Sequence, residues 1–457
     1  MLTLIGEYHG ELETDKEGKI VSRWLQGIGT GQVSYDYVIP LDVHRLAGMD
    51  FEQQFFNTIE LPTYTKTGKI SKKVRKVTQK TDEFKGYIEA LKERLYDTKP
   101  NAVVAFGSNV LNCLTDMGNI LNYRGSVLDS TLVPGLKVIP VVHPKWIYDK
   151  AQWQYYYLNS IDIKKAGYES TFTGIHRNEF RSIIAPSFNI CIDFLERLCG
   201  EQQLWSFDIE TRAGSIACLG FCVGSEAICI PIQTTQGPAW SVDEEAVIWQ
   251  KVGKVFASNP NLVGQNLTYD LDWMLDYGVE ACGIALDTMI GQFILAPEMP
   301  KGLDYICSIY TDAIYYKDEG KTWTSKIPDE QLWKYNCKDT YYTLKAADEI
   351  YKTLSGNGML ALWEDYGKKL FPIALEIQKR GLEVDNQSKE ELQRIIIEEY
   401  HKLRPQVVDA VGYEINVNSP KAVQKHLREN LHLPLRKKRG RDTITADEDA
   451  LMGFLTK

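Results

Sequence analysis

Short apolar runs alternate with longer amphipathic stretches through residues 1–165. Three of these runs are typical of strands that a parallel sheet buries on both faces; they are Leu2–Ile5, Ala102–Ala105 and Val138–Val142. Strands that alternate with helical patterns in this way predict an α/β layer domain. We expect the region after it, residues 166–202, to be a linker, because Gly167 to Ser187 is polar and aperiodic.

A second α/β unit is predicted for residues 203–355. It begins with three strand-like runs joined by short turns, Leu204–Glu210, Ile216–Val223 and Ala227–Ile232. Ser241 is followed three residues later by Glu244, and this capping-box spacing predicts the start of a helix. Leu262–Val263 is a further strand candidate, and helical patterns then dominate the unit. It should therefore contain a mixed sheet with helices.

The remaining residues, 356–457, have a helical pattern. Residues 370–385 predict a helix that Gly381 stops, and a longer helix is expected from Ser388 to Val411. Ser419, directly before a proline, offers a cap and a first-turn proline for a short third helix. A loop with five cations within six residues follows, and these cations are Arg436, Lys437, Lys438, Arg439 and Arg441.

The composition is that of a soluble globular protein, with 44% apolar and 25% charged residues, and 457 residues suggest about three domains. The chain lacks both a run of about 18 uncharged apolar residues and a signal-peptide pattern, so we expect no membrane span. Nine scattered cysteines without metal-ligand spacing predict reduced thiols in the cytoplasm. A net charge of −9 usually opposes nucleic-acid binding, but cations cluster at Lys66–Lys80 and Arg436–Arg441.

Four carboxylates and a tyrosine occur at spacings that bring side chains together. Asp208 and Glu210 are two residues apart on a predicted strand, so they project from the same face. Tyr335 and Asp339 are four residues apart on a predicted helix and also share a face. Asp270 lies near the start of a predicted helix that follows a strand. Taken singly, each has an ordinary alternative: a solvated strand, an exposed helix face, or a helix cap.

Together these residues supply what hydrolysis of a phosphodiester requires. The reaction passes through a crowded, negatively charged phosphorus centre, and two divalent cations roughly 4 Å apart can stabilise it and activate water. Mg²⁺ and Mn²⁺ prefer carboxylate oxygens, and adjacent carboxylates are costly unless cations lie between them. We therefore predict a two-metal site formed by Asp208, Glu210, Asp270 and Asp339, with the Tyr335 hydroxyl orienting the water.

In this order and at these separations, Asp-x-Glu, Gly-Gln-Asn-x-x-x-Asp and Tyr-x-x-x-Asp resemble the DEDDy 3′-5′ exonucleases. The match is closest to the proofreading domain of family A DNA polymerases, covers roughly residues 200–355 and implies an RNase H-like fold. It also implies that Tyr335 positions the water, that Asn266 lies near the substrate strand and that Asp287 is a supporting residue. The metal ligands it implies are Asp208, Glu210 and Asp339 for one ion and Asp270 for the other.

The end of the chain resembles the thumb of family A polymerases, through Asn-Val-Asn-Ser-Pro-Lys at 416–421 and Thr-Ala-Asp-Glu-Asp-Ala-Leu at 445–451. In that family the thumb grips duplex DNA, so the resemblance implies phosphate contacts by the cations of 436–441, with a solvated turn as the alternative. We find no candidate for the palm carboxylates or the fingers helix. We therefore expect part of a split or truncated polymerase that needs a second chain. That chain would supply palm and fingers and dock on the stripe of Leu451, Phe454 and Leu455.

The first domain resembles the uracil-DNA glycosylase superfamily over roughly residues 1–160. The resemblance rests on Gly-Glu at 6–7, Ala-Phe-Gly-Ser at 105–108, Arg-Gly at 124–125 and Val-His-Pro-Lys at 142–145. It implies that Glu7 aids attack by water and that His143 stabilises the departing uracil anion. No asparagine for reading uracil is found at the expected place, and no iron–sulphur cluster is expected because Cys113 is the only cysteine before residue 191. A DNA-gripping or architectural domain is the alternative.

Two classes of function follow from these patterns. The first is a magnesium-dependent 3′-5′ exonuclease, the proofreading portion of a family A polymerase of the bacteriophage type, which would place the chain in the host cytoplasm. It would take a single-stranded 3′ end at the exonuclease site and duplex DNA at the thumb. The second is a non-catalytic DNA clamp for a separate polymerase chain, and a glycosylase acting on uracil in DNA is a further possibility.

Overall fold

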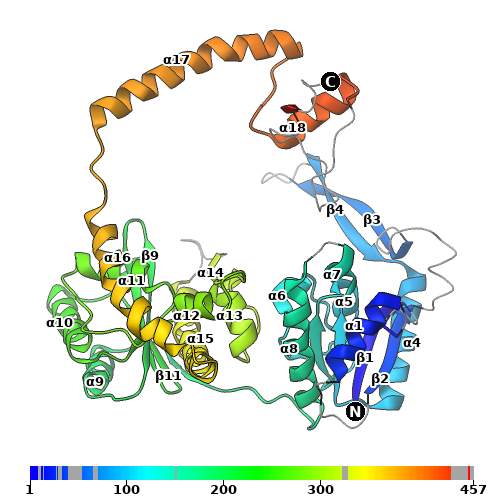
Figure 1. The fold of residues 1–457 in the computed structure, drawn as a ribbon, viewed down its shortest axis with the longest axis horizontal. Coiled ribbons are helices and arrows are strands. Elements are labelled where there is room, and N and C mark those ends of the chain that lie inside the picture. The colour runs from blue at the N-terminus through cyan, green and yellow to red at the C-terminus, as the bar shows by residue number, and fades with distance from the viewer. Residues whose placement is uncertain are drawn as a thin grey trace. The chain divides into compact units, whose positions relative to one another are not determined.

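The computed structural model describes residues 1–8, 12–13, 15–26, 28, 33–39, 54–64, 70–149, 152–321, 328–433 and 451–452. The chain divides into two compact units, residues 1–147 with 153–379 and residues 148–152 with 380–457. The first unit contains two large sheets, each with its own core, and two small two-stranded sheets (Figure 1). Within these described ranges, no helix combines the length and the apolar character that a membrane crossing requires.

The N-terminal lobe is built on a five-stranded sheet of order β2-β1-β5-β7-β6. Four strands run parallel, and the short β6 pairs antiparallel with β7. The bounds are β1 (Leu2–Tyr8), β2 (Val33–Ile39), β5 (Ala102–Phe106), β6 (Leu128–Asp129) and β7 (Lys137–Val141). β5 and β7 are buried along their whole length, so the parallel strands expected from the apolar runs are confirmed.

Helices cover this sheet, and a hairpin adds a second, two-stranded sheet. The helices are α1 (Asp15–Leu25), α4 (Asp82–Thr98), α5 (Ser108–Thr115), α6 (Ile120–Tyr123), α7 (Lys145–Asp149) and α8 (Gln154–Glu169). The hairpin pairs β3 (Phe56–Tyr64) with β4 (Ile70–Lys80). Residues 70–80 of the basic segment Lys66–Lys80 therefore form a strand. Lys66 and Lys69 lie outside the described residues.

The second lobe contains a six-stranded mixed sheet of order β15-β14-β9-β10-β11-β8. Its centre is an antiparallel meander, and β14 pairs parallel with β9. The three predicted strands and the strand at Leu262–Val263 are thereby confirmed. The bounds are β8 (Arg181–Ile183), β9 (Trp205–Arg212), β10 (Ser215–Val223), β11 (Glu226–Pro231), β14 (Leu262–Gly264) and β15 (Leu286–Asp287), with a small ribbon of β12 (Gln233–Thr234) and β13 (Gly237–Pro238).

One long helix, α15 (Asp329–Gly356), packs across this sheet and buries Tyr341, Ala346, Ala347 and Ile350 in the core (Figure 1). Ser241 and Glu244 form the predicted capping box at the start of α10. The other helices are α10 (Val242–Ser258), α11 (Leu267–Asp276), α12 (Thr288–Leu295), α13 (Leu303–Tyr310) and α14 (Asp318–Lys321).

Both predicted boundaries of this lobe are corrected by the structure. β8 pairs with β11, and α9 (Phe188–Cys199) buries Phe194 and Leu195 in the core, so residues 181–202 belong to the lobe and are not linker. At the other end, the π-helical turn η1 (Leu362–Gly367) and α16 (Lys368–Arg380) bury Trp363 and Phe371 in the same core. The boundary expected at 356 therefore lies near residue 380. The predicted boundaries were wrong because the apolar residues of α9, η1 and α16 pack on core residues that are distant in sequence.

The second unit contains α17 (Asn386–Val411), α18 (Pro420–Lys425) and the π-helical turn η2 (His426–Asn430). α17 begins at Asn386, two residues before the predicted start at Ser388, because Asp385 caps it. It ends as predicted at Val411, and the Gly412 that follows it has a left-handed φ of 84°. Ser419 caps α18 through the Ala422 amide, also as predicted. The cations at 436–441 lie outside the described residues, as do Phe454 and Leu455.

Candidate metal centre in the second lobe

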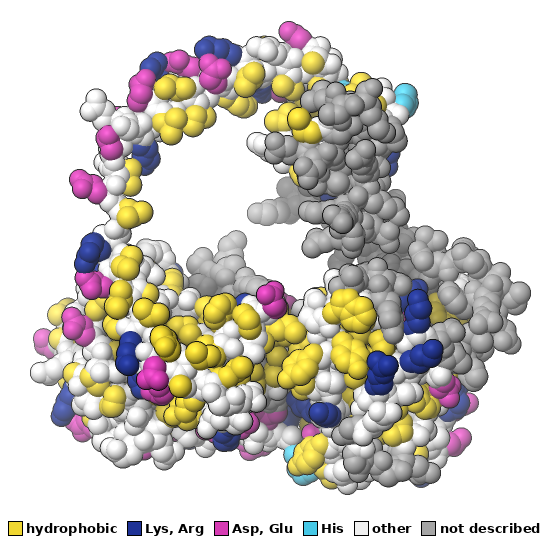
Figure 2. Space-filling model, viewed as in Figure 1, with side chains coloured by type: hydrophobic (Ala, Val, Ile, Leu, Met, Phe, Trp, Pro, Cys, Tyr) yellow, Lys and Arg dark blue, Asp and Glu magenta, His cyan; other side chains and the backbone are white. Residues whose placement is uncertain are grey.

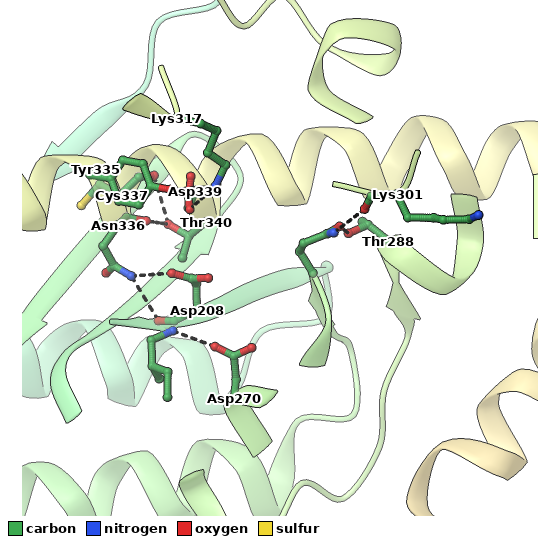
Figure 3. A network of polar contacts seen from close by, with 12 residues as sticks. Asp208, Asp270, Thr288, Lys301, Lys317, Tyr335, Asn336, Cys337, Asp339 and Thr340 are labelled. Carbon is green, nitrogen blue, oxygen red and sulfur yellow. Dashed lines mark hydrogen bonds and ion pairs between the residues drawn. The ribbon is translucent and has the colours of Figure 1, made fainter. Parts of the chain in front are cut away.

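Two carboxylates project together from β9. Phe207 and Ile209 are buried in the core, while Asp208 and Glu210 are half-buried on the opposite face of the strand. Asp339 from α15 faces them, and each of the three carboxylates offers an oxygen within 4.8 Å of the others. Figure 3 shows Asp208 and Asp339 approaching one another from the strand and the helix. The alternation predicted for the strand therefore produces a convergent acidic cluster.

Asp270 reaches the same strand from α11. Its Oδ1 accepts a hydrogen bond of 2.9 Å from the backbone N–H of Ile209, the residue between the two strand carboxylates (Figure 3). Asp270 is 4% exposed. It is not a cap for α11, because the helix begins at Leu267 and Asn266 occupies the cap position. The structure thus places all four predicted carboxylates around β9.

Tyr335 and Asp339 share a face of α15, and one lysine binds both. The Lys317 ammonium donates to the Tyr335 hydroxyl at 2.9 Å and to Asp339 Oδ2 at 2.5 Å (Figure 3). Burial, and then the Asp339 charge, raises the pKa of Tyr335, so the hydroxyl keeps its proton at neutral pH. Burial alone would lower the pKa of Lys317, but Asp339 and Tyr335 outweigh burial and raise it. Lys317 was not identified from the sequence, where no short-range spacing connects it to Tyr335.

Asn336 is a second residue that sequence reasoning missed. Its Nδ2 donates to Asp208 Oδ2 at 2.8 Å and fixes the orientation of that carboxylate (Figure 3). The side chain fits because β10 carries a glycine opposite Asp208: a Cβ on Gly220 would lie 2.3 Å from Asn336 Oδ1. The residue next to Tyr335 on the helix therefore packs against the sheet and not toward solvent.

Burial and mutual repulsion both raise the pKa values of these carboxyls. Burial, followed by the charge on Asp339, raises the pKa of Asp208 to about 7. The pKa of Glu210 is raised well above its usual value by burial and then by Asp208 and Asp339. Burial and then Asp208 have the same effect on the pKa of Asp270. Because one lysine cannot neutralise four carboxylates, the arrangement favours additional cations.

The residues present fit divalent cations. Carboxylate oxygens are the ligands that Mg²⁺ and Mn²⁺ prefer. Asp339 Oδ1 is buried and has no hydrogen-bond partner among the described residues, so an acceptor remains within the acidic cluster. Asp208, Glu210 and Asp339 could hold one ion, and Asp270 lies beside the same strand.

Two further predicted residues lie at the edge of this centre. Asp287 is 1% exposed and caps α12 through the Met289 and Ile290 amides, while its other oxygen accepts from the Leu267 amide. It therefore holds the start of α11, the helix that carries Asp270. Asn266 has a left-handed φ of 59° and an exposed side chain directly before α11. That position leaves its amide accessible to solvent.

The N-terminal lobe brings a second set of predicted residues together. Glu7 lies near the carboxyl end of β1, and His143 lies just after β7. β5 runs between these two strands, and Gly107, directly after β5, lies between Glu7 and His143. A Cβ on Gly107 would lie 3.5 Å from Glu7 Oε1 and 3.6 Å from the His143 Cβ. Asn109, which the sequence did not reveal, donates to Glu7 Oε1 at 3.0 Å. Ligands commonly bind at this edge of a parallel sheet.

Comparisons with known proteins identify relatives of this chain, and the family match lies in the second lobe. Residues 193–355 match the model of a 3′-5′ exonuclease family of DNA polymerase A. DNA polymerase I of Borreliella burgdorferi is 23% identical over 290 residues, 63% of this chain and 31% of that protein. DNA polymerase I of Synechocystis is 27% identical over 232 residues, 49% of this chain and 23% of that protein. The chain thus spans less than a third of either relative.

Among solved structures, the POL domain of Pol1 from M. smegmatis, in complex with DNA primer-template and dNTP, matches with a TM-score of 0.41 and 17% identity. The match covers 60% of this chain and 45% of that one. A TM-score this low does not establish a shared fold. From the family match and the curated relatives, residues 193–355 form a 3′-5′ exonuclease domain of the DNA polymerase I type.

Proposed function

We propose that the chain removes nucleotides from the 3′ end of DNA by a two-metal mechanism, as the proofreading portion of a family A DNA polymerase. One observation carries the proposal: Asp208, Glu210 and Asp339 form a carboxylate cluster inside the segment that matches the exonuclease family. Asp270 and Tyr335 lie at the same cluster. The mixed sheet with α15 across it supports the RNase H-like fold that the sequence resemblance implies.

Each side chain of the site has a separate role in the proposed reaction. Divalent cations held by the four carboxylates would supply the positive charge that water activation and the leaving 3′ oxygen require. The Tyr335 hydroxyl would orient the attacking water, since it keeps its proton and accepts from Lys317 on one side. Asn336 keeps the Asp208 carboxylate in one orientation, and Asn266 would contact the substrate strand.

The test is digestion of 5′-labelled single-stranded DNA with Mg²⁺, with Mn²⁺ and with EDTA. Asp208→Asn and Asp270→Asn should both reduce product to the level seen in EDTA, because each removes charge that a cation needs. Asp193→Asn is the matched control, since Asp193 is an exposed carboxylate of α9 away from the cluster. Equal digestion by all four proteins would reject the site, and DNA binding without digestion by the wild type would favour a clamp.

A partner chain forms part of the proposal. α17 has no buried residue, and an apolar stripe at i, i+4, i+8 and i+11 runs along it through Leu392, Ile396, Tyr400 and Leu403. Figure 2 shows apolar side chains gathered along this helix. Leu451, on the predicted docking stripe, is 38% exposed. Since the relatives are DNA polymerases I, we infer that a chain supplying palm and fingers covers this surface.

Co-purification and primer extension test this inference. The chain should extend a primer only together with the palm-and-fingers chain, and Leu392→Glu with Ile396→Glu should abolish co-purification while leaving the exonuclease intact. Glu391→Lys, on the charged side of the same helix, is the control. Primer extension by the 457-residue chain alone would overturn the inference.

A second candidate function concerns the N-terminal lobe. Glu7 and His143 lie on either side of Gly107 at the carboxyl edge of a parallel sheet, and Asn109 binds Glu7; the resemblance to uracil-DNA glycosylases implies roles for Glu7 and His143. Excision of uracil from single-stranded DNA should then be lost in Glu7→Gln and in His143→Ala, and kept in Glu93→Gln, which changes an exposed residue of α4. Absence of excision by the wild type would leave this lobe a DNA-gripping or architectural role.

A further inference from the structure

We propose that Lys317 is a positioning residue of the exonuclease site, which fixes the Tyr335 hydroxyl relative to the carboxylate cluster. The inference rests on the proposed function and deepens it, because it adds a residue that neither the motifs nor the comparisons assign. Lys317 lies between α13 and α14, outside every motif of the carboxylate pattern. In space it approaches α15 and contacts two residues of the site at once (Figure 3).

The two hydrogen bonds of Lys317 determine what Tyr335 can do. A tyrosine hydroxyl has one O–H donor and lone pairs that accept, and an ammonium can only donate. At 2.9 Å the Lys317 ammonium occupies an accepting position of the Tyr335 oxygen. The O–H of Tyr335 must then point elsewhere, toward an acceptor such as a water oxygen. Because the same ammonium binds Asp339, the hydroxyl is held in register with a predicted metal ligand.

The surroundings of Lys317 restrict its movement. Its side chain is 17% exposed, and the ammonium lies 5.0 Å from the centre of the Tyr335 ring. Three residues later, Gly320 packs against that ring so closely that a Cβ would lie 2.7 Å from Tyr335 Cζ. Glu319 accepts two hydrogen bonds from Lys338 of α15, at 2.6 and 2.8 Å. The segment 317–320 therefore contacts α15 at Tyr335, Lys338 and Asp339.

The segment is also anchored before Lys317. Arg124 of the N-terminal lobe donates to Ser308 Oγ at 2.8 Å, and its guanidinium forms a buried ion pair with Asp162. Lys165 donates to the Thr311 carbonyl at 3.3 Å. A cation that merely balanced charge could sit on a loose loop, whereas Lys317 lies on a segment fixed at several points. Such an anchored segment suits a side chain that has to hold Tyr335 in one position.

The competing explanation is that Lys317 only neutralises the carboxylates when cations are absent. A counter-ion of that kind would leave Asp339 when a divalent cation binds, so its removal should strengthen cation binding and leave turnover unchanged. If Lys317 positions Tyr335, removing the lysine side chain leaves the Tyr335 hydroxyl without a fixed orientation, so turnover should fall. The two roles therefore predict different changes in kcat and in cation affinity.

The experiment compares wild type, Lys317→Gln, Lys317→Arg, Tyr335→Phe and the double variant Lys317→Gln/Tyr335→Phe in single-stranded DNA digestion at saturating Mg²⁺. Mn²⁺ binding to each protein is titrated separately by calorimetry, a readout that does not depend on activity. We expect Lys317→Gln to lower kcat by about 10- to 100-fold with little change in KM, as loss of orientation commonly does. Lys317→Arg should recover part of the loss because it keeps the charge and the donors.

The double variant decides whether the effect passes through Tyr335. If it does, Lys317→Gln/Tyr335→Phe should be no slower than the slower single variant, because the second change removes a partner that is already lost. Lys352→Gln, an exposed lysine on α15, is the control for charge alone. Additive losses in kcat, or tighter Mn²⁺ binding by Lys317→Gln with wild-type kcat, would overturn the proposal. Absence of digestion by the wild type would reject the proposed function itself.

Discussion

Without divalent cations, the exonuclease lobe should lose stability as the pH rises. Burial and mutual repulsion raise the pKa values of Asp208, Glu210 and Asp270. The folded, cation-free protein therefore keeps protons at pH values where the unfolded chain has released them. By linkage, the stability contributed by such carboxyls is fully present below their unfolded pKa and is lost as the pH rises through their folded pKa.

The size of the effect follows from Asp208. Its pKa rises from 3.8 to about 7, and each unit corresponds to ~1.4 kcal/mol. About two units of this interval lie between pH 5 and pH 8, so Asp208 alone should cost ~3 kcal/mol over that range. For a lobe of this size, ~2–4 °C per kcal/mol converts the loss into a fall in melting temperature of roughly 6–12 °C.

Calorimetry in EDTA between pH 5 and pH 8 measures this fall for the wild type and for Asp208→Asn. The variant lacks the titrating carboxyl and its repulsion of the neighbours, so its profile should be flatter and its melting temperature at pH 8 should be the higher of the two. Adding Mg²⁺ at pH 8 should recover the wild type far more than the variant. Parallel profiles in EDTA would refute the reasoning, since pH effects shared by both proteins would then explain the whole loss.

Three further changes have defined outcomes. Gly220→Ala should displace the Asn336 side chain, cost ~1–3 kcal/mol in the free energy of unfolding and slow digestion, whereas Gly253→Ala, with only a 4.0 Å contact, should do neither. Asp270→Ala should lower the melting temperature more than Asp270→Asn, because alanine leaves the Ile209 N–H without its acceptor. Alanine at the five cations of 436–441 should reduce the log–log salt slope of duplex binding by ~0.9 per lost phosphate contact, and an unchanged slope would indicate a solvated turn.

The sequence predicted those features that depend on short spacings. Alternation along a strand placed Asp208 and Glu210 on one face, and a four-residue spacing placed Tyr335 and Asp339 on one face of α15. The buried parallel strands of the first lobe followed from their uninterrupted apolar composition. These predictions succeeded because each needs only the local geometry of a strand or a helix.

Features that depend on tertiary packing were not predicted. The polar stretch before β9 resembled a linker, yet Phe194 and Leu195 of α9 are buried in the second lobe. Residues 356–457 were predicted to form a separate helical region, but the indole N–H of Trp363 donates to the Ala285 carbonyl of the exonuclease lobe. Lys317 approaches Tyr335 only because α13 and α14 return the chain to α15. No local pattern reports such contacts.

The hydrogen bond between Ile209 and Asp270 shows how the fold and the site depend on one another. Among the described residues, β14 pairs with β9 only at Trp205 and Ser206, so the N–H of Ile209 beyond them needs another acceptor. Asp270 supplies it with one carboxylate oxygen. Because Ile209 lies between Asp208 and Glu210, satisfying this single backbone group also fixes α11 against the two strand carboxylates. The position of Asp270 beside the other three carboxylates is therefore set by the end of the pairing between β14 and β9. Cations would bind next to the part of β9 that lies beyond this pairing.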